Sequence, residues 1–209
     1  MSSASIRVLL IEDHYLARMA LRSVLSERSD IVIVGEACDG ASGVELFRQT
    51  APDVTVMDLR LPGVNGFDAI AAIRKHCKTA KIAVLSNYEG SEDIYRAIRA
   101  GALAYLTKDA SGEEVVEAIL SVHRGIRYLP RTARDRLAER TPLEELTPRE
   151  HEVLTCITQG QTNRDIAERL RIAEKTVRIH VSSVLDKMGA RDRTQATIYA
   201  IQRGLVHWD

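Results

Sequence analysis

The sequence predicts an α/β domain built on a parallel sheet of five strands, followed by a small all-α domain. Two observations support this prediction: five short apolar segments recur with helix-length spacers in the first half, whereas the last third shows only helical periodicity. At 209 residues the chain has room for two modest domains. An apolar share of 45% and a charged share of 28% are ordinary for globular proteins.

The five apolar segments are predicted strands because each is short and bounded by turn residues; they span residues 8–11, 31–34, 54–57, 82–85 and 104–106. Between them apolar residues recur at helical intervals, as in the first spacer, with Leu16, Met19, Ala20 and Val24. Strands that are apolar on both faces and alternate with helices indicate a parallel sheet with right-handed crossovers.

Four of these strands end in residues suited to phosphoryl chemistry, namely Glu12 with Asp13, Asp58, Ser86 and Lys108. The carboxyl ends of parallel strands lie along one edge of the sheet, so these side chains can form one pocket. Three neighbouring carboxylates need a cation to stay ionised, and Mg²⁺ prefers such oxygen ligands. A carboxylate beside an ammonium group can also accept and hold a phosphoryl group.

Residues 6–124 resemble the receiver domain of two-component response regulators, on the motifs EDH at 12–14, MDLRLPGVNG at 57–66, LSNY at 85–88 and AGALAYLTKDAS at 100–111. The resemblance implies a doubly wound, flavodoxin-like sheet of strand order 2-1-3-4-5. It also implies residue roles: Asp58 as phosphoacceptor, Glu12, Asp13 and Asp58 with the Arg60 carbonyl as Mg²⁺ ligands, Lys108 as the phosphate-binding lysine, and Ser86 and Tyr105 as switch residues.

Two bulky residues are expected to influence the lifetime of the phosphorylated state. Arg60 and Tyr88 lie two residues beyond the acceptor and the switch hydroxyl, respectively. In receiver-like pockets these positions flank the path of an attacking water molecule. The sequence therefore predicts slow hydrolysis.

A linker is predicted over residues 125–146, between a first domain at 1–124 and a second at 147–209, because this segment holds two prolines, five arginines and few large apolar groups. Helix signals then return. Thr147, Pro148 and Glu150 form a capping box with proline at the first helical position, and Thr162 opens a helix over 163–170. A third helix is predicted to end at Gly189, and a fourth spans about 194–203.

The second and third of these helices have the length and spacing of a helix-turn-helix. Residues 146–196, from LTPRE through TVRIH, resemble the LuxR-type DNA-binding domain along its whole length. With the receiver in front, the chain resembles response regulators of the NarL/FixJ family. The resemblance implies contacts to double-stranded DNA from the third helix, through Lys175, Thr176, Arg178, Ile179, Ser182 and Lys187. Ala173 stands where relatives often have a serine cap, so this helix is expected to begin without a side-chain cap.

The predicted function is a transcriptional regulator that a sensor histidine kinase phosphorylates on Asp58 in the presence of Mg²⁺. Phosphorylation is expected to promote homodimerisation and binding to a two-fold operator. Ile198 and Ile201 on the last helix are candidate dimer contacts, although they could instead complete the core. The formal net charge is zero, and the 10 basic against 8 acidic residues from residue 147 onward permit DNA binding without demonstrating it.

Two alternatives remain: a constitutive DNA-binding regulator whose receiver is not phosphorylated, and an aspartyl-phosphate phosphohydrolase. Arg60 stands where such hydrolases have a second acid, which disfavours the latter. We therefore expect no enzymatic activity beyond the chain's own phosphoryl transfer and autodephosphorylation. Neither an apolar leader nor a long aliphatic stretch is evident, so a cytoplasmic protein without a membrane partner is expected.

Overall fold

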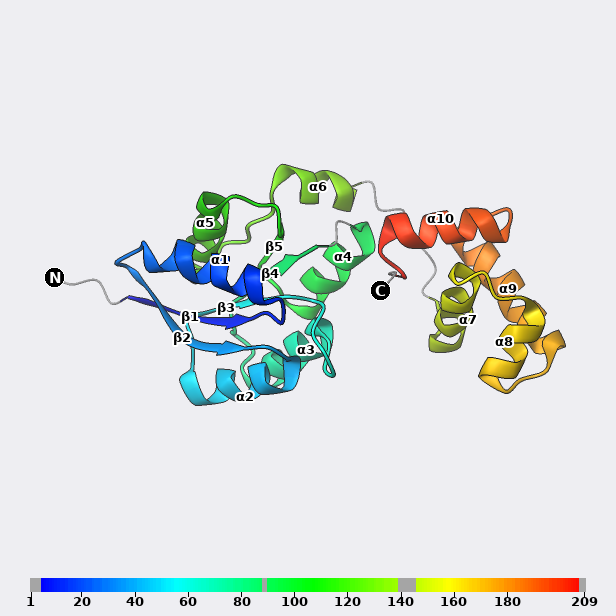
Figure 1. Cartoon of the computed structure of the whole chain (residues 1–209). Coiled ribbons are helices and arrows are strands. Elements are labelled where there is room, and N and C mark those ends of the chain that lie inside the picture. The colour runs from blue at the N-terminus through cyan, green and yellow to red at the C-terminus, as the bar shows by residue number, and fades with distance from the viewer. Residues whose placement is uncertain (1–4, 88–89, 139–145, 207–209) are drawn as a thin grey trace. The chain divides into compact units, whose positions relative to one another are not determined.

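The structure is a computed structural model that describes residues 5–87, 90–138 and 146–206, and the chain forms two compact units (Figure 1). The first unit is a sheet covered by helices on both faces. The second contains residues 90–93 together with the chain from residue 138 onward, and most of it is formed by the helices that follow residue 146. Among the described residues, no helix is both long and apolar enough to cross a membrane.

The sheet of the first unit is parallel and has the order β2-β1-β3-β4-β5, as the sequence predicted. Its strands are β1 (Ile6–Ile11), β2 (Ile31–Ala37), β3 (Val54–Met57), β4 (Ile82–Ser86) and β5 (Ala104–Thr107). The strand β2 runs beyond its predicted end, through Gly35 and Glu36, because ladder hydrogen bonds to β1 continue past the apolar run.

Helices α1 (Tyr15–Ser26) and α5 (Gly112–His123) cover one face of the sheet, and α2 (Gly40–Thr50), α3 (Gly66–His76) and α4 (Ser91–Ala100) cover the other (Figure 1). Each face of the sheet has its own hydrophobic core, and successive residues of β1 point alternately into the two cores. Leu10 packs on the α1 side, and Leu9 and Ile11 pack on the α3 side. Burial on both faces explains why the strands have continuous apolar sequences.

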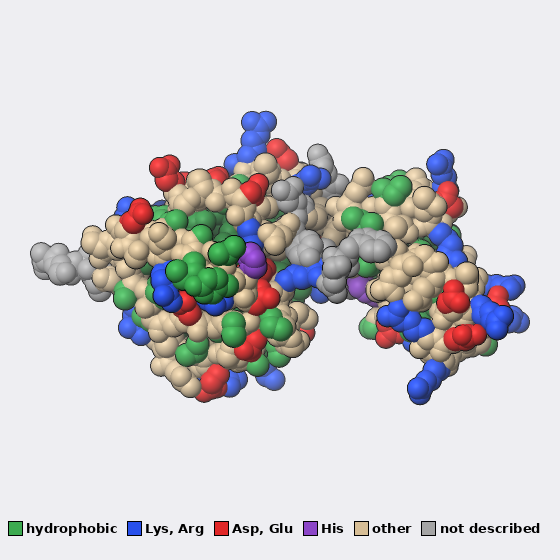
Figure 2. Space-filling model, viewed as in Figure 1, with side chains coloured by type: hydrophobic (Ala, Val, Ile, Leu, Met, Phe, Trp, Pro, Cys, Tyr) green, Lys and Arg blue, Asp and Glu red, His purple; other side chains and the backbone are tan. Residues whose placement is uncertain are grey.

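The apolar residues whose spacing predicted α1 are not the ones that are buried: Leu16, Met19 and Ala20 are exposed, and Val24 is half-buried. Leu21 and Leu25 are buried, whereas Leu16 and Met19 are 68% and 41% exposed. Together with exposed Tyr15, they form an apolar patch on the face that carries α1, seen in green in Figure 2. Helical spacing identified the element but not which of two apolar stripes faces the core, since that depends on the position of the sheet.

Part of the predicted linker is folded into the first unit. The Tyr128 amide donates to the Leu103 carbonyl at 2.9 Å, and Tyr128 forms a parallel bridge with Ala104 at the edge of β5. The following helix α6 (Arg131–Ala138) buries Ala133 in the core on the α4 side. Tyr128 thus pairs with backbone groups at the edge of β5 that would otherwise be exposed. The linker prediction for 125–146 is corrected accordingly: residues up to 137 belong with the first unit, and 139–145 lie outside the described residues.

The second unit contains α7 (Pro148–Thr158), α8 (Asn163–Leu170), α9 (Glu174–Met188) and α10 (Arg193–Arg203), close to the predicted bounds. Both predicted capping boxes form, at Thr147 and at Thr162. Gly189 ends α9 with φ +62°, a left-handed conformation that favours glycine. As expected, Ala173 provides no side-chain cap for α9.

Candidate functional site

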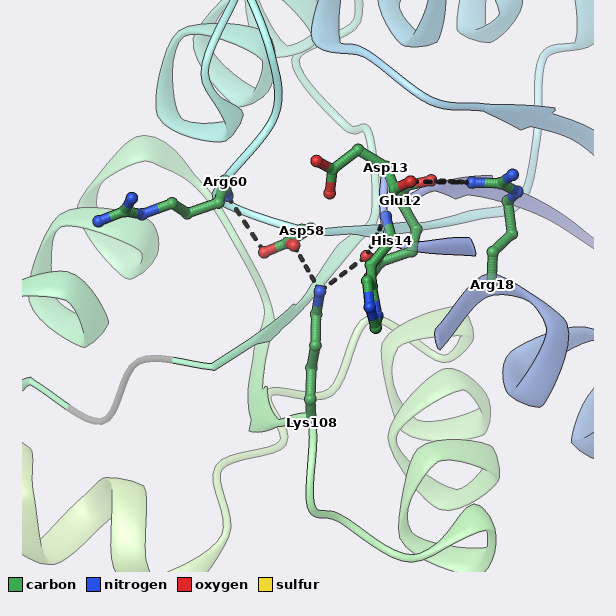
Figure 3. A network of polar contacts seen from close by, with 7 residues as sticks. All are labelled: Glu12, Asp13, His14, Arg18, Asp58, Arg60 and Lys108. Carbon is green, nitrogen blue, oxygen red and sulfur yellow. Dashed lines mark hydrogen bonds and ion pairs between the residues drawn. The ribbon is translucent and has the colours of Figure 1, made fainter. Parts of the chain in front are cut away.

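The carboxyl ends of β1 and β3 bring Glu12, Asp13 and Asp58 together, as the sequence predicted (Figure 3). One carboxylate oxygen from each lies within 4.8 Å of the others. Glu12 and Asp58 are buried, at 2% and 4% exposed, while Asp13 is exposed. The loop after β3 stays close because residue 66 is glycine: a Cβ there would lie 2.4 Å from the Asp58 carbonyl oxygen.

Lys108, directly after β5, bridges two of these acids. Its Nζ lies 2.7 Å from Oε1 of Glu12 and 2.5 Å from Oδ2 of Asp58 (Figure 3). Burial raises the pKa of Glu12, as does the neighbouring Asp58, against the opposing effect of Lys108. Burial also acts to lower the pKa of Lys108, but hydrogen bonds to Asp58 and Glu12 outweigh it and raise that pKa. The ammonium therefore stays charged and holds the pocket together.

The three carboxylates could hold a divalent cation. Oε1 of Glu12 accepts from Lys108 and from the His14 amide at 3.0 Å, but the buried Oε2 has no hydrogen-bond partner among the described residues. A buried carboxylate oxygen without a partner is costly unless a ligand occupies it. Three carboxylates also exceed the charge of one ammonium by two, which matches a hard divalent cation with oxygen ligands.

Arg60 and Ser86 lie at the same end of the sheet. The Arg60 amide donates to Oδ1 of Asp58 at 3.1 Å, and its side chain points away from the acids (Figure 3). Ser86 is fully buried at the end of β4, and its carbonyl accepts from the Lys108 amide at 2.9 Å. Tyr105 is fully buried on the α4 side of β5. Tyr88 lies outside the described residues.

Sequence reasoning missed one residue beside this pocket. Nη1 of Arg18, on α1, donates to the Glu12 carbonyl at 2.6 Å, as Figure 3 shows. A basic residue one turn into the helix that follows the acidic pair was the available signal.

In the second unit, α9 has a buried side and a broad exposed side. Val177, Val184 and Met188 are buried. Exposed residues recur at intervals of three and four on the other side, at Lys175, Arg178, Ile179 and Ser182, with Thr176 half-buried. Ile179 is 62% exposed, so its side chain is accessible to another molecule. Lys and Arg side chains are mixed with Asp and Glu over the part of this unit that carries α8 (Figure 2).

Lys187 does not share that exposed surface. Its Nζ lies 2.7 Å from Oε2 of the buried Glu150, and the Ser183 hydroxyl donates to Oε1 of the same carboxylate at 2.6 Å. Hydrogen bonds from Lys187 and Ser183 lower the pKa of Glu150 to about 2. In this structure Lys187 links α9 to α7 through Glu150, so the position of its ammonium does not support the predicted contact with DNA.

Ile198 and Ile201 do not complete the core of the second unit. They are 47% and 43% exposed on α10, whose buried residues are Ala196 and Ala200. The alternative that these isoleucines serve only as core residues is therefore wrong. Both remain available for contact with another molecule.

Comparison with known proteins gives two family matches. Residues 8–120 match the response regulator receiver domain, and residues 144–200 match the bacterial regulatory proteins of the luxR family. The transcriptional regulatory protein LiaR of Bacillus subtilis (strain 168) is 39% identical, over 97% of this chain and 100% of its own. The response regulator protein VraR of Staphylococcus aureus (strain Mu3 / ATCC 700698) is 36% identical, over 97% and 99%. The crystal structure of the response regulator ChrA, from a heme-sensing two-component system, has a TM-score of 0.59 and 35% identity, covering 98% of this chain and 100% of ChrA.

Proposed function

The chain belongs to the two-component response regulators of the NarL/FixJ family, in which a LuxR-type DNA-binding domain follows a receiver, and we propose that Asp58 is its phosphoacceptor. It is a DNA-binding regulator of transcription and not a classical enzyme. One observation carries the residue assignment: the buried Asp58 carboxylate lies between the Lys108 ammonium and the Arg60 amide, beside two further acids.

The proposed donor is a phosphohistidine on a sensor histidine kinase. A carboxylate oxygen of Asp58 attacks the phosphorus atom, the phosphorus–nitrogen bond breaks, and the imidazole leaves with the bonding electrons. The Lys108 ammonium then turns from the carboxylate to a phosphoryl oxygen, to which it contributes positive charge. The Ser86 hydroxyl donates to another phosphoryl oxygen.

The proposed cation is Mg²⁺, held by Glu12, Asp13 and Asp58 with the Arg60 carbonyl. When bound, Mg²⁺ supplies charge neutralisation for the phosphoryl oxygens. The unpartnered Oε2 of Glu12 supports this proposal, since a cation satisfies it directly. Hydrolysis of the acyl phosphate by water is the only other reaction that we propose for the pocket.

The proposed output is dimerisation and operator binding. Ser86 and Tyr105 act as switch residues, and phosphorylation favours a homodimer in which Ile198 and Ile201 of α10 form contacts. The dimer binds a two-fold DNA site through α9, with Arg178, Ile179 and Ser182 facing the bases and Lys175 and Thr176 near the backbone. The exposure of this face of α9 supports the assignment. Since DNA is the target, we place the protein in the cytoplasm.

Intact-mass spectrometry after incubation with a small acyl phosphate and Mg²⁺ tests the assignment of Asp58. We expect one added phosphate in the wild type and none in Asp58→Asn, which keeps the shape but removes the nucleophile. Asp30→Asn is the matched control, because Asp30 is a surface carboxylate that pairs with Arg28, and it should label fully.

Chelation of Mg²⁺ should also stop labelling of the wild type. Full labelling of Asp58→Asn would show that another residue accepts the phosphate. Equal DNA affinity with and without donor, in a protein that does label, would favour the constitutive regulator.

A further inference from the structure

Arg18 contacts the backbone that presents the acidic pair. Its Nη1 donates to the Glu12 carbonyl at 2.6 Å and lies 3.5 Å from the Asp13 carbonyl. The side chain is 21% exposed. In Figure 3 the guanidinium lies on the far side of the Glu12–Asp13 backbone from Lys108, so it contacts the turn and not the carboxylates.

The Glu12 amide donates to the Ala37 carbonyl at 3.0 Å, but the start of the helix that follows the turn has no side-chain cap. The N-cap of α1 is His14, whose side chain makes no capping hydrogen bond, and the first turn of α1 contains no acidic residue. A helix start of this kind lacks the usual interactions that fix the entering chain. Two hydrogen bonds replace these interactions: one from Arg18 to the Glu12 carbonyl, and one from the His14 amide to Oε1 of Glu12.

The charge of Arg18 is compensated on the side away from the pocket. Its Nε lies 3.7 Å from Oε2 of Glu36, near the end of β2. Arg22, one turn further along α1, donates to Oε1 of the same carboxylate through Nε at 3.0 Å and Nη2 at 2.6 Å. Glu36 therefore contacts both arginines, but only Arg18 reaches the acidic turn.

We infer that Arg18 is a positioning residue for the cation site, which it serves by fixing the Glu12 carbonyl and hence the placement of the Glu12 and Asp13 carboxylates. The inference rests on the Mg²⁺ site proposed above. Mg²⁺ requires near-ideal octahedral geometry, so a small displacement of two ligands weakens binding. Loss of a group that orients metal ligands typically costs 10–100-fold in affinity.

The sign of the change in Mg²⁺ affinity distinguishes a positioning role of Arg18 from a purely electrostatic effect of its charge. A guanidinium near a cation site repels the cation, so removing its charge should tighten Mg²⁺ binding if charge were its only influence. Removing a positioning contact should weaken binding. Arg22→Ala provides the matched control, because it removes a guanidinium from the same helix and the same Glu36 partner without touching the turn.

Isothermal titration calorimetry of the full chain with MgCl₂ measures the dissociation constant directly, without phosphoryl transfer. We expect Arg18→Ala to bind Mg²⁺ about 10-fold more weakly. Arg22→Ala should bind within about twofold of the wild type or slightly more tightly. Arg18→Lys keeps one donor for the Glu12 carbonyl and should recover part of the loss. Thermal unfolding in EDTA checks that the variants are folded; if Arg18→Ala is not, Arg18→Lys compared with Arg22→Lys decides the question.

Unchanged or tighter Mg²⁺ binding in Arg18→Ala, or an equal loss in Arg22→Ala, overturns the inference. Asp13→Asn separates this outcome from failure of the proposed site. If the wild type binds no Mg²⁺, or if Asp13→Asn binds it as tightly as the wild type, the site itself is wrongly assigned. If Asp13→Asn loses binding but Arg18→Ala does not, only the role of Arg18 is refuted.

Discussion

Glu150 links the cap of α7 to α9 through one carboxylate. Its Oε2 accepts from the Thr147 amide at 2.7 Å and from Lys187, while Oε1 accepts from Ser183. The capping box thus fixes the start of α7 and, through the same side chain, the position of α9. Because Lys187 and Ser183 lower the pKa of Glu150 to about 2, the folded state favours its ionised form.

We expect Glu150→Gln to lower the free energy of unfolding by about 2 kcal/mol at pH 7, since it breaks hydrogen bonds to a charged group. The pKa of Glu150 falls from the usual 4.5 to about 2 on folding, so its contribution is full above pH 4.5 and is lost as the pH falls toward 2. Urea unfolding at several pH values measures both effects. Glu152→Gln is the control, because Glu152 forms only an exposed pair with Arg149. A similar loss in both variants would contradict this account.

Arg178 is expected to determine base preference. Its side chain is 69% exposed and pairs with Glu174 at 2.7 Å, a surface ion pair that is weak enough to exchange for DNA. Arg178→Ala should lower the preference for the specific site by about 1 to 3 kcal/mol. Lys175→Ala should lower affinity evenly for all sequences and flatten its salt dependence. Fluorescence anisotropy with operator DNA and with random DNA distinguishes the two effects. Equal losses of affinity for both DNAs in Arg178→Ala would mean that Arg178 contacts the DNA backbone and not the bases.

At the scale of elements, β5 connects the phosphoryl pocket to α6. Lys108, directly after this strand, binds Asp58, while Tyr105 and Thr107 line a cavity of about 20 Å³. The cavity is also lined by Ile94 of α4, by Pro130, and by Thr132, Ala133 and Arg136 of α6. Lys108 therefore directly follows Thr107, whose side chain lines the cavity beside α6.

Ala133→Glu should release α6 from the first unit, because it places a larger, charged side chain in a buried position. A cost of about 1 to 3 kcal/mol corresponds to roughly 5- to 150-fold faster hydrogen exchange in residues 126–137, including the Tyr128 amide. Ala138→Glu, the same change at an exposed position of the same helix, should leave exchange unaltered. Hydrogen exchange with mass spectrometry of the full chain measures this. Equal protection in both variants would show that α6 contributes no stabilising contact.

For the whole molecule, the expected readout of phosphorylation is association. Light scattering should show a monomer without donor and a dimer after incubation with acyl phosphate and Mg²⁺. Ile198→Glu should weaken this association at least tenfold, because it places a charge on the apolar face of α10. Ile179→Glu, the same change at another exposed apolar position, on α9, should still dimerise but lose operator affinity. An unchanged mass with donor, in a protein that carries the phosphate, would exclude phosphate-dependent dimerisation.

The sequence by itself determined the five strands, most of the helices, and which acidic and basic residues meet where the strands end. Continuous apolar runs fixed the five strands, and Glu12, Asp58 and Lys108 followed from the position of strand ends along one edge of a parallel sheet. The capping boxes were also predictable, because the groups at Thr147 and Thr162 lie within one turn of their partners. Such features depend on local geometry, which a short stretch of sequence specifies.

Only the tertiary structure decided which residues distant in sequence share a partner. Lys187 contacts Glu150 across 37 positions, and Tyr128 pairs with an edge strand formed more than twenty residues earlier. On α1 the fold selected Leu21 and Leu25 for burial over Leu16 and Met19. It also turned Arg18 toward the Glu12 carbonyl, a backbone atom that leaves no trace in a pattern of side chains. These choices depend on where the sheet and the helices lie in space, and periodicity in one chain segment does not contain that information.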